Sequence, residues 1–338
     1  MNLRPKSLIA AFGILITAAA LAQDAQPARP APDGAAVSKS DAKKPVYDEH
    51  ADAKTQIAAA LARAGKENRR VLIQWGGNWC PWCIKLHALF GENREIAREL
   101  EYEYEIVYVD SGKPQGKNVD LASTYGANLA KHGYPFLTIL DADGKALANQ
   151  ESSPLEVDGK RVEAGHDPAK VLALLKKHEA APRDATKTLD AALARAKTEQ
   201  KTAFVHFGAP WCGWCRKLEA WLERDEVSAI LAKDFVEVKI DIDRMTGGKD
   251  VLSKYAGTDK IGIPWTVFLD PGGKALADSN EKPGDSNSNI GFPAQDNEIA
   301  HFLKMIKQVA TRISADDCEK LRKSLRASDT PGRAVSRP

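Results

Sequence analysis

The sequence lacks an excess of charge of either sign, with 48 Lys and Arg residues against 46 Asp and Glu residues. It shows no stripe of basic residues of the kind that binds nucleic acid. The seven histidines include no pair with the His-x-x-x-His spacing typical of a metal site on a helix. His50, His166 and His178 are expected at the surface or in loops. We therefore predict neither a nucleic-acid partner nor a histidine metal site.

The sequence also has few long runs of apolar residues. The run at residues 8–22 follows Arg4 and Lys6 and ends in a small-x-small sequence, Ala-Leu-Ala, at residues 20–22. A basic start, a short apolar core and such an ending are typical of a signal peptide, and the run is too short for a convincing membrane span. We predict cleavage after Ala22 and export, with the bacterial periplasm as the best-suited compartment and an uncleaved anchor as the alternative. No stable membrane span is expected.

Cysteine is scarce too, but four of the five cysteines form two Cys-x-x-Cys pairs. Residues 80–83 read CPWC, and residues 212–215, 132 positions later, read CGWC. An apolar stretch precedes each pair, at residues 71–73 and 203–205, and apolar residues at helical spacing follow it. Each pair therefore lies where a strand leads into a helix. There, the helix dipole and unpaired N–H groups favour the reactive thiolate of the first cysteine.

The similarity between the two segments extends well beyond the cysteines. Residues 57–64 match residues 189–196 at the same offset, and residues 133–141 match residues 262–270 at an offset of 129. The loop between the cysteines and the second match is therefore three residues shorter in the second copy. Each copy is expected to contain a helix, a strand, the cysteine helix, a strand, a spacer, a proline-led strand, a turn, a strand and a last helix.

This pattern resembles the thioredoxin superfamily, twice in tandem. The resemblance depends on Trp-Cys-x-x-Cys at residues 79–83 and 211–215, together with Pro135 and Pro264. It implies an α/β fold with two thioredoxin-like domains, each a mixed central sheet flanked by helices. The expected parts are a signal peptide (1–22), a Pro/Ala-rich linker (23–48), two domains (49–180 and 184–312) and a C-terminal tail (313–338).

The resemblance also implies site residues. The prolines are expected to be cis and to lie against the disulfide, with neighbouring backbone that pairs with a substrate peptide. The tryptophans beside and between the cysteines are expected to contact substrate and to be partly exposed. The implied substrate-binding residues are Trp79, Trp82, Tyr134, Pro135, Trp211, Trp214, Ile263 and Pro264.

The function expected from this resemblance is an exported thiol–disulfide oxidoreductase that needs no cofactor. Cys80 and Cys212 would attack as thiolates, and Cys83 and Cys215 would resolve the mixed disulfides. Its partners would be exported protein thiols or disulfides and a redox protein that recycles the sites. Two alternatives stay open: a peptide-binding holdase in which the cysteines are secondary, and a protein that handles Cu(I) or another metal through its thiolates.

The sequence departs from ordinary thioredoxins at two positions of each site. Trp82 and Trp214 stand where thioredoxins carry proline, so the reduction potential cannot be carried over. Gln74 and His206 stand where thioredoxins keep a buried acid that accepts the proton of the second thiol. A neutral imidazole can accept a proton, so we predict that His206 does so and that the second site is the faster one. A hydrogen-bonded core histidine is the alternative.

The fifth cysteine, Cys318, lies outside both motifs. It is in step with Leu321 and Leu325, which favours a small apolar residue on a helix over a reactive thiol.

Overall fold

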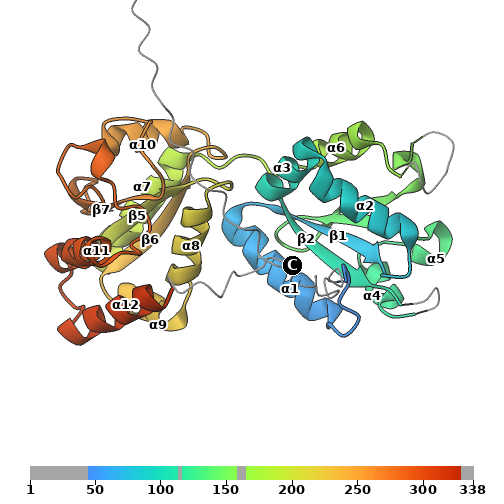
Figure 1. The fold of residues 1–338 in the computed structure, drawn as a ribbon, viewed down its shortest axis with the longest axis horizontal. Coiled ribbons are helices and arrows are strands. Elements are labelled where there is room, and N and C mark those ends of the chain that lie inside the picture. The colour runs from blue at the N-terminus through green and yellow to red at the C-terminus, as the bar shows by residue number, and fades with distance from the viewer. Residues whose placement is uncertain (1–44, 113–115, 158–164, 329–338) are drawn as a thin grey trace, which may run out of the picture. The chain divides into compact units, whose positions relative to one another are not determined.

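The computed structural model describes residues 45–112, 116–157 and 165–328 (Figure 1). It contains two four-stranded sheets, one in residues 49–180 (the first repeat) and one in residues 184–312 (the second repeat). The predicted signal peptide and most of the predicted linker lie outside the described residues, as does the end of the predicted tail. The expected α/β class, with a mixed sheet flanked by helices in each copy, is confirmed.

The first sheet has the strand order β2-β1-β3-β4, with β1 parallel to β2 and the other neighbours antiparallel. Its elements are α1 (Ala53–Glu67), β1 (Arg70–Gly76), α2 (Pro81–Glu92), α3 (Arg94–Glu103), β2 (Tyr104–Asp110), α4 (Val119–Thr124), α5 (Leu129–His132), β3 (Phe136–Leu140), β4 (Ala146–Glu151), the 3-10 helix η1 (Ser153–Leu155) and α6 (Pro168–Lys177).

The second sheet repeats the topology, with the order β6-β5-β7-β8. Its elements are α7 (Ala185–Glu199), β5 (Thr202–Gly208), α8 (Gly213–Leu222), α9 (Asp225–Leu231), β6 (Phe235–Asp241), α10 (Gly248–Ala256), β7 (Trp265–Leu269), β8 (Ala275–Asp278), the 3-10 helix η2 (Ser286–Ser288), α11 (Asp296–Val309) and α12 (Ala315–Ser328).

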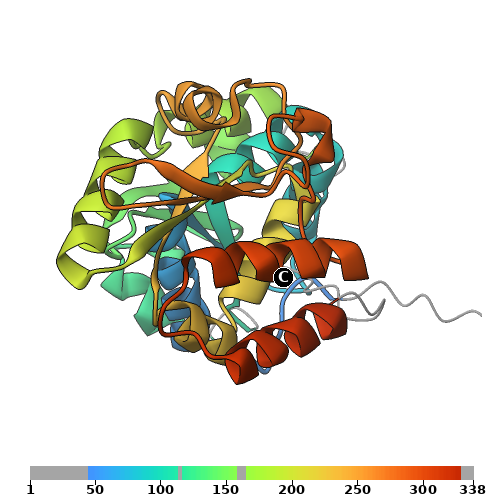
Figure 2. The same ribbon diagram turned by 90° about the vertical axis from the view of Figure 1, so that its left-hand side faces the viewer.

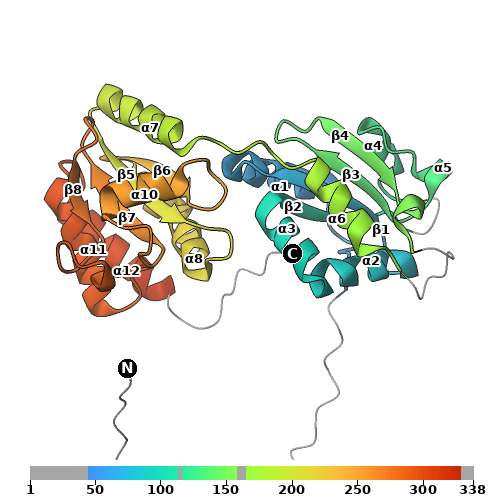
Figure 3. The same ribbon diagram turned by 90° about the horizontal axis from the view of Figure 1, so that it is seen from above.

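The alternation of side chains along the central strand divides each repeat into two cores. In β1, Val71, Ile73 and Trp75 pack with α1, α4 and α5, whereas Leu72 packs with α2, α3 and α6. Figure 3 shows α2 and α6 on the side of the first sheet away from α4. Gln74 and Gly76 lie on the same face of β1 as Leu72. The Gln74 side chain and the Cα atom of Gly76 therefore face α2, the helix that carries the cysteines.

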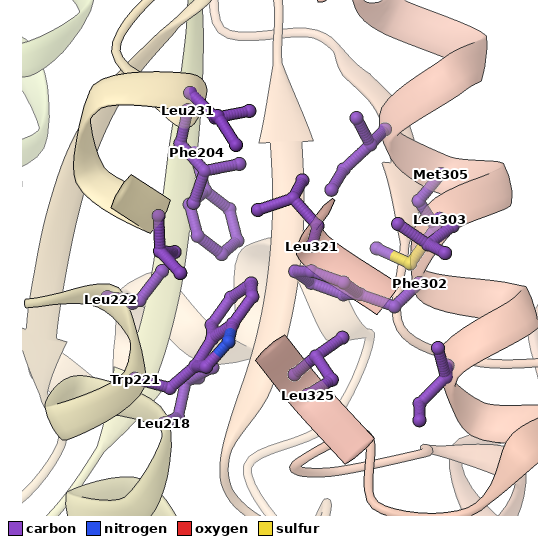
Figure 4. Packing of buried hydrophobic residues seen from close by; sticks show 14 of the residues in the cluster. Phe204, Leu218, Trp221, Leu222, Leu231, Phe302, Leu303, Met305, Leu321 and Leu325 are labelled. Atoms are coloured by element: carbon purple, nitrogen blue, oxygen red, sulfur yellow. The ribbon is translucent and has the colours of Figure 1, made fainter. Parts of the chain in front are cut away.

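The second repeat has the larger core. Phe204 of β5 contacts a cluster from α8, α9, α11 and α12, in which Trp221, Phe302 and Leu321 are fully buried (Figure 4). Figure 2 shows α11 and α12 running side by side. Cys318 is buried on α12 in this cluster, and burial raises the pKa of its thiol. The spacing of Cys318 with Leu321 and Leu325 correctly indicated a core residue. The core of the second repeat therefore continues into α12, past residue 312, where the second domain was expected to end.

The sequence pattern missed several helices in each repeat. Between the cysteine helix and the following strand lie α3 and α9, where no further helix was expected, and the stretch expected as a spacer contains α4 and α5 in the first repeat and α10 in the second. Asn93 explains the first break, because its extended backbone ends α2 while its side-chain oxygen accepts from the N–H groups of Glu95 and Ile96 to begin α3. The last helices, expected at 168–177 and 298–309, match α6 and most of α11.

Within the described parts of the chain, no helix combines the length and the apolar character needed to cross a bilayer.

Candidate active sites

The first cysteine of each pair caps its helix. Cys80 is the N-cap of α2, and its sulfur accepts a hydrogen bond from the backbone N–H of Cys83 at 3.2 Å. Cys212 is the N-cap of α8 and accepts in the same way from Cys215 at 3.1 Å. Donors aimed at a sulfur stabilise its thiolate form, as does the positive end of the helix dipole. The predicted position at a helix N-terminus is therefore what the structure shows.

Both pairs are joined as disulfides, with 5.2 Å between the Cα atoms in each. The outer cysteines, Cys80 and Cys212, are each 4% exposed, whereas Cys83 is fully buried and Cys215 is 2% exposed. All four cysteines are therefore buried in the disulfide form, and the first of each pair is slightly the more exposed.

The proline loops lie beside the sulfurs. The Tyr134–Pro135 and Ile263–Pro264 peptide bonds are both cis. In the second site the carbonyl oxygen of Ile263 lies 3.5 Å from Cys212 Sγ. In the first site the ring of Tyr134 meets Trp79 edge-on, with centroids 5.4 Å apart.

Asn289 supports the second proline loop, and the sequence pattern did not single it out. Its side-chain amide donates to the carbonyl oxygens of Gly262 at 2.7 Å and Pro264 at 3.1 Å. Ser279 Oγ donates to the amide oxygen of Asn289 at 2.8 Å and so fixes its orientation. The polar loop that follows β8 thereby holds the backbone beside Cys212.

The surroundings of the first site are closed. Trp82 is half-buried, and its ring meets His166 edge-on with centroids 5.4 Å apart. His166 was expected at the surface or in a loop; it lies outside the named helices and strands but is buried, and burial lowers its pKa to about 4. His50 is exposed and His178 half-buried at the C-cap of α6.

The second site presents far more apolar surface. Trp211 and Trp214 are each 54% exposed, compared with 37% for Trp79. The ring of Trp214 stacks on Phe292, and the ammonium group of Lys217 lies 4.8 Å from the Trp214 ring centroid and 4.9 Å from that of Phe292. The expected exposure of the tryptophans is thus clearest at this site.

Beneath Cys215 lies a half-buried charged pair that the sequence pattern also missed. A Cβ atom placed on Gly208 would lie 3.3 Å from Cys215 Sγ and 3.7 Å from Glu219 Oε1, so both atoms border one small space. Glu219 is one helical turn after Cys215 and pairs with Lys239 of β6 at 2.8 Å. Lys239 also pairs with Glu67 at 2.6 Å.

His206 shares this face of the second sheet with Gly208. It is 2% exposed, and its Nε2 lies 3.2 Å from Glu237 Oε1. Partial desolvation of Glu237 opposes its ionisation, but the hydrogen bond with His206 and the nearby positive charges outweigh it and lower the pKa of that carboxyl. The imidazole of His206 therefore has a carboxylate partner, Glu237. The role of His206 in proton transfer stays a prediction.

The matching position of the first repeat holds a neutral pair. Gln74 is fully buried and donates through Nε2 to Tyr47 Oη at 2.6 Å and to the carbonyl oxygen of Cys83 at 3.0 Å. Tyr47 comes from the segment before α1, which the sequence assigned to the linker. The one signal that would have found it is the apolar pair Val46 and Tyr47, which ends the Pro/Ala-rich stretch.

A family model described as Thioredoxin-like matches both repeats, at residues 52–142 and 184–271. A protein disulfide-isomerase, erp38, of Neurospora crassa is 25% identical over 218 residues, which cover 64% of this chain and 54% of the relative. The disulfide bond reductase DsbH of Chlamydia pneumoniae is 28% identical over 105 residues, which cover 29% of this chain and 61% of the relative. The chain spans about half the length of the first of these relatives.

Among solved structures, a disulphide isomerase from Xylella fastidiosa is 26% identical, with 39% of this chain and 95% of that chain covered and a TM-score of 0.33. The family assignment does not depend on this similarity. It follows from the family model, whose two matches include both Cys-x-x-Cys pairs and together cover more than half of the sequence. The chain therefore belongs to the thioredoxin-like family.

Proposed function

We propose that this protein is a thiol–disulfide oxidoreductase that exchanges disulfides with other proteins through both Cys-x-x-Cys sites. The observation that carries the proposal is the shared geometry of the two pairs. In each, a helix-capping cysteine with an N–H donor on its sulfur lies in front of a buried second cysteine. The names of the relatives, a disulfide isomerase and a disulfide bond reductase, agree with this chemistry.

The exchange proceeds in two steps, described here for reduction at the second site. The thiolate of Cys212 attacks one sulfur of a client disulfide, a mixed disulfide forms, and the other client sulfur leaves as a thiolate. Cys215 then loses its proton and attacks Cys212, so the site becomes a disulfide and the second client sulfur leaves. Two electrons have moved from the protein to the client. Oxidation of a client is the same sequence in reverse.

We propose that the second site receives unfolded or extended client segments. Trp211 and Trp214 flank its outer cysteine with exposed apolar surface, and the backbone of Ile263 lies beside the reacting sulfur. Exposed aromatic side chains beside the proline loop suit an apolar stretch of polypeptide. The first site is the more enclosed one, so it is the better candidate for exchange with a dedicated redox protein that recycles the chain.

Two groups are candidates for the proton of Cys215. His206 is the candidate predicted from the sequence, and we keep the proposal that it makes the second site the faster one. Glu219 is the candidate added by the structure, because its carboxylate borders the same space as the sulfur of Cys215. A base must lie within reach of the proton that it takes, either directly or through one water molecule.

The direct test uses chains that keep only Cys80 and Cys83, or only Cys212 and Cys215, with serine at the other pair. Each is titrated with glutathione, and its turnover of a disulfide-containing peptide is measured. We expect each chain to form one intramolecular disulfide and to turn the peptide over. A potential near about −270 mV would indicate a reductant, and one near about −120 mV an oxidant.

Serine at all four positions is the control for this test. We expect it to abolish turnover, because no other described cysteine is exposed. Undiminished activity in this variant would contradict the oxidoreductase function and favour a peptide-binding holdase. Absence of a disulfide in both single-site chains under oxidising conditions would contradict it as well.

Export is a separate part of the proposal, because residues 1–44 lie outside the described structure. The basic residues and apolar run at the N-terminus support a signal peptide that is cleaved after Ala22. The mass of the protein recovered from the periplasm of an expressing bacterium tests this. We expect a chain that begins at Gln23, and a full-length chain retained in the cytoplasm would contradict export.

A further inference from the structure

The orientation of the Gln74 amide is fixed by its neighbours. The carbonyl oxygen of Cys83 can only accept, so the amide nitrogen of Gln74, 3.0 Å away, must face it. The same nitrogen lies 2.6 Å from Tyr47 Oη, so the phenol oxygen accepts from Gln74. A phenol has one proton of its own, and this arrangement leaves the proton of Tyr47 to be donated to another group.

The sulfur of Cys83 borders the same space as the hydroxyl group of Tyr47. A Cβ atom placed on Gly76 would lie 2.5 Å from Cys83 Sγ and 2.6 Å from Tyr47 Oη, so both atoms border the same small space beside the glycine. Tyr47, Cys80 and Cys83 form one buried cluster. The phenol oxygen thus lies under the second sulfur of the first site.

The backbone of Tyr47 is held in this place by the loop that precedes Cys80. The amide of Asn78 accepts from the Tyr47 N–H at 3.0 Å and donates to the Tyr47 carbonyl oxygen at 2.9 Å. These two bonds clamp one residue from both sides. The second site has Pro210 at the position of Asn78, so it cannot form such a clamp.

We propose that Tyr47 donates a hydrogen bond to Cys83 Sγ when the disulfide of the first site is reduced, and thereby stabilises the thiolate and the dithiol state of that site. The proposal rests on the thiol–disulfide exchange proposed above. Reduction by a dithiol partner transfers two electrons to the Cys80–Cys83 bond and leaves the partner as a disulfide. The phenol keeps its proton throughout and acts only as a donor.

The other polar groups around Tyr47 are consistent with a donor role. Burial raises the pKa of Tyr47 above its ordinary range, so the phenol stays protonated at neutral pH. The charge of Asp110 and the neighbouring phenol of Tyr108 act in the same direction. Tyr108 meets the Tyr47 ring edge-on at 5.8 Å and the His87 ring at 5.0 Å.

The second site has a carboxylate–ammonium pair, Glu219 and Lys239, at the equivalent place. There, the space beside Gly208 is bordered by Cys215 and by the carboxylate of Glu219. A negative group opposes formation of a thiolate, whereas a phenol donor favours it. The first site is therefore expected to hold its electrons more tightly and to have the higher reduction potential, so electrons would pass from the second site to the first.

The potential is tested in the full chain with Cys212→Ser and Cys215→Ser, with and without Tyr47→Phe. We expect Tyr47→Phe to raise the equilibrium constant for disulfide formation against glutathione about tenfold, because a hydrogen bond to a charged group is lost. Tenfold corresponds to a potential about 30 mV lower for a two-electron couple. Tyr108→Phe is the matched control, and we expect a change below about twofold.

A second measurement separates donation from packing. With Cys80→Ser added, the thiolate absorbance of Cys83 is followed against pH in two chains, one that keeps Tyr47 and one that carries Tyr47→Phe. We expect the absorbance to appear about one pH unit higher in the variant. Superimposable titration curves in folded chains would overturn the proposal, whatever happens to the potential.

Gln74→Met gives an independent variant if Tyr47→Phe does not fold. It leaves the phenol in place but removes the N–H group that orients it, so a smaller shift in the same direction is expected, and none would count against the proposal. Failure of the parent chain to exchange with glutathione would contradict the proposed function. The titration of Cys83 would still decide the role of Tyr47.

Discussion

The two sites of this protein share a scaffold but differ in what surrounds the buried sulfur. In the first, a phenol from outside the repeat and a neutral amide lie beneath Cys83. In the second, a carboxylate–ammonium pair lies beneath Cys215, and two exposed tryptophans flank the outer cysteine. The helix cap that activates the first cysteine is the same in both. The fold therefore gives the first cysteine of both pairs the same position, and the groups under the second sulfur distinguish the two sites.

The glycine before each site shows how closely the two environments are packed. A methyl group on Gly76 would lie within 2.6 Å of two atoms, Cys83 Sγ and Tyr47 Oη, whereas one on Gly208 would find its nearest neighbour at 3.1 Å. The first site has no room because Tyr47 fills the space. The second has a little, because Glu219 is turned towards Lys239.

Alanine at these two glycines gives the largest expected difference between the repeats. We expect Gly76→Ala to destabilise the chain by about 1–3 kcal/mol, the usual cost of overpacking, and to displace Tyr47 from Cys83. Gly208→Ala should cost less than about 1 kcal/mol, since small shifts of Cys215 suffice. Urea unfolding of both variants measures the difference. Equal costs would mean that the space under Cys83 is not limiting.

Removal of the candidate bases tests the proton transfer at the second site. We expect Glu219→Gln to slow attack of Cys215 on the mixed disulfide about tenfold at pH 7, because a candidate base that borders the space beside the thiol is lost. His206→Gln should slow it too if the imidazole accepts the proton. Stopped-flow tryptophan fluorescence of the chain that keeps only Cys212 and Cys215 measures this step. An unchanged rate in both variants would remove both groups from the mechanism.

The tryptophans between the cysteines should differ in what they contribute. We expect Trp214→Ala to raise the KM for an unfolded peptide disulfide about threefold, a loss of roughly 0.6 kcal/mol of apolar and cation–π contact. Trp82→Ala should leave the KM of the first site nearly unchanged, because Trp82 packs on His166. Peptide turnover by the two single-site chains gives both values. A larger effect at Trp82 would reverse the proposed assignment of the client site.

Local sequence patterns correctly predicted that each Cys-x-x-Cys pair lies where a strand leads into a helix. Apolar strand, Trp-Cys-x-x-Cys and amphipathic helix follow one another directly, so the helix cap at Cys80 and Cys212 depends on neighbours within a few residues. The repeated pattern predicted the topology for the same reason, because each copy confirmed the periodicity of the other. Helices α3 and α9 were missed where a short turn interrupts a continuous polar and apolar pattern.

The groups under the buried sulfurs depend on distant contacts, and the sequence could not show them. Tyr47 reaches Cys83 from 36 positions away and from a segment whose composition resembles a linker. Glu219 follows Leu218 on a helix, and its charge is typical of a solvated face. Only the approach of β6, which brings Lys239 to it, makes its position a half-buried one.

A carboxyl pair of the first repeat, Glu99 and Glu179, should distinguish the pH dependence of the repeats, with the smallest effect. Burial and the neighbouring Glu179 raise the pKa of Glu99 on α3 to about 7. The folded state therefore keeps a proton that the unfolded chain releases near its ordinary pKa, so stability is lost as the pH rises from about 4.5 to 7. The corresponding helix of the second repeat, α9, buries apolar side chains instead of a carboxyl group: Val227, Ile230 and Leu231.

We expect Glu99→Gln to raise the Tm by about 1–2 °C at pH 8, a modest gain because the group is partly exposed, and to change it little at pH 4. Calorimetry at the two pH values measures both, and an equal shift at pH 4 and pH 8 would show that the gain does not come from the charge of Glu99.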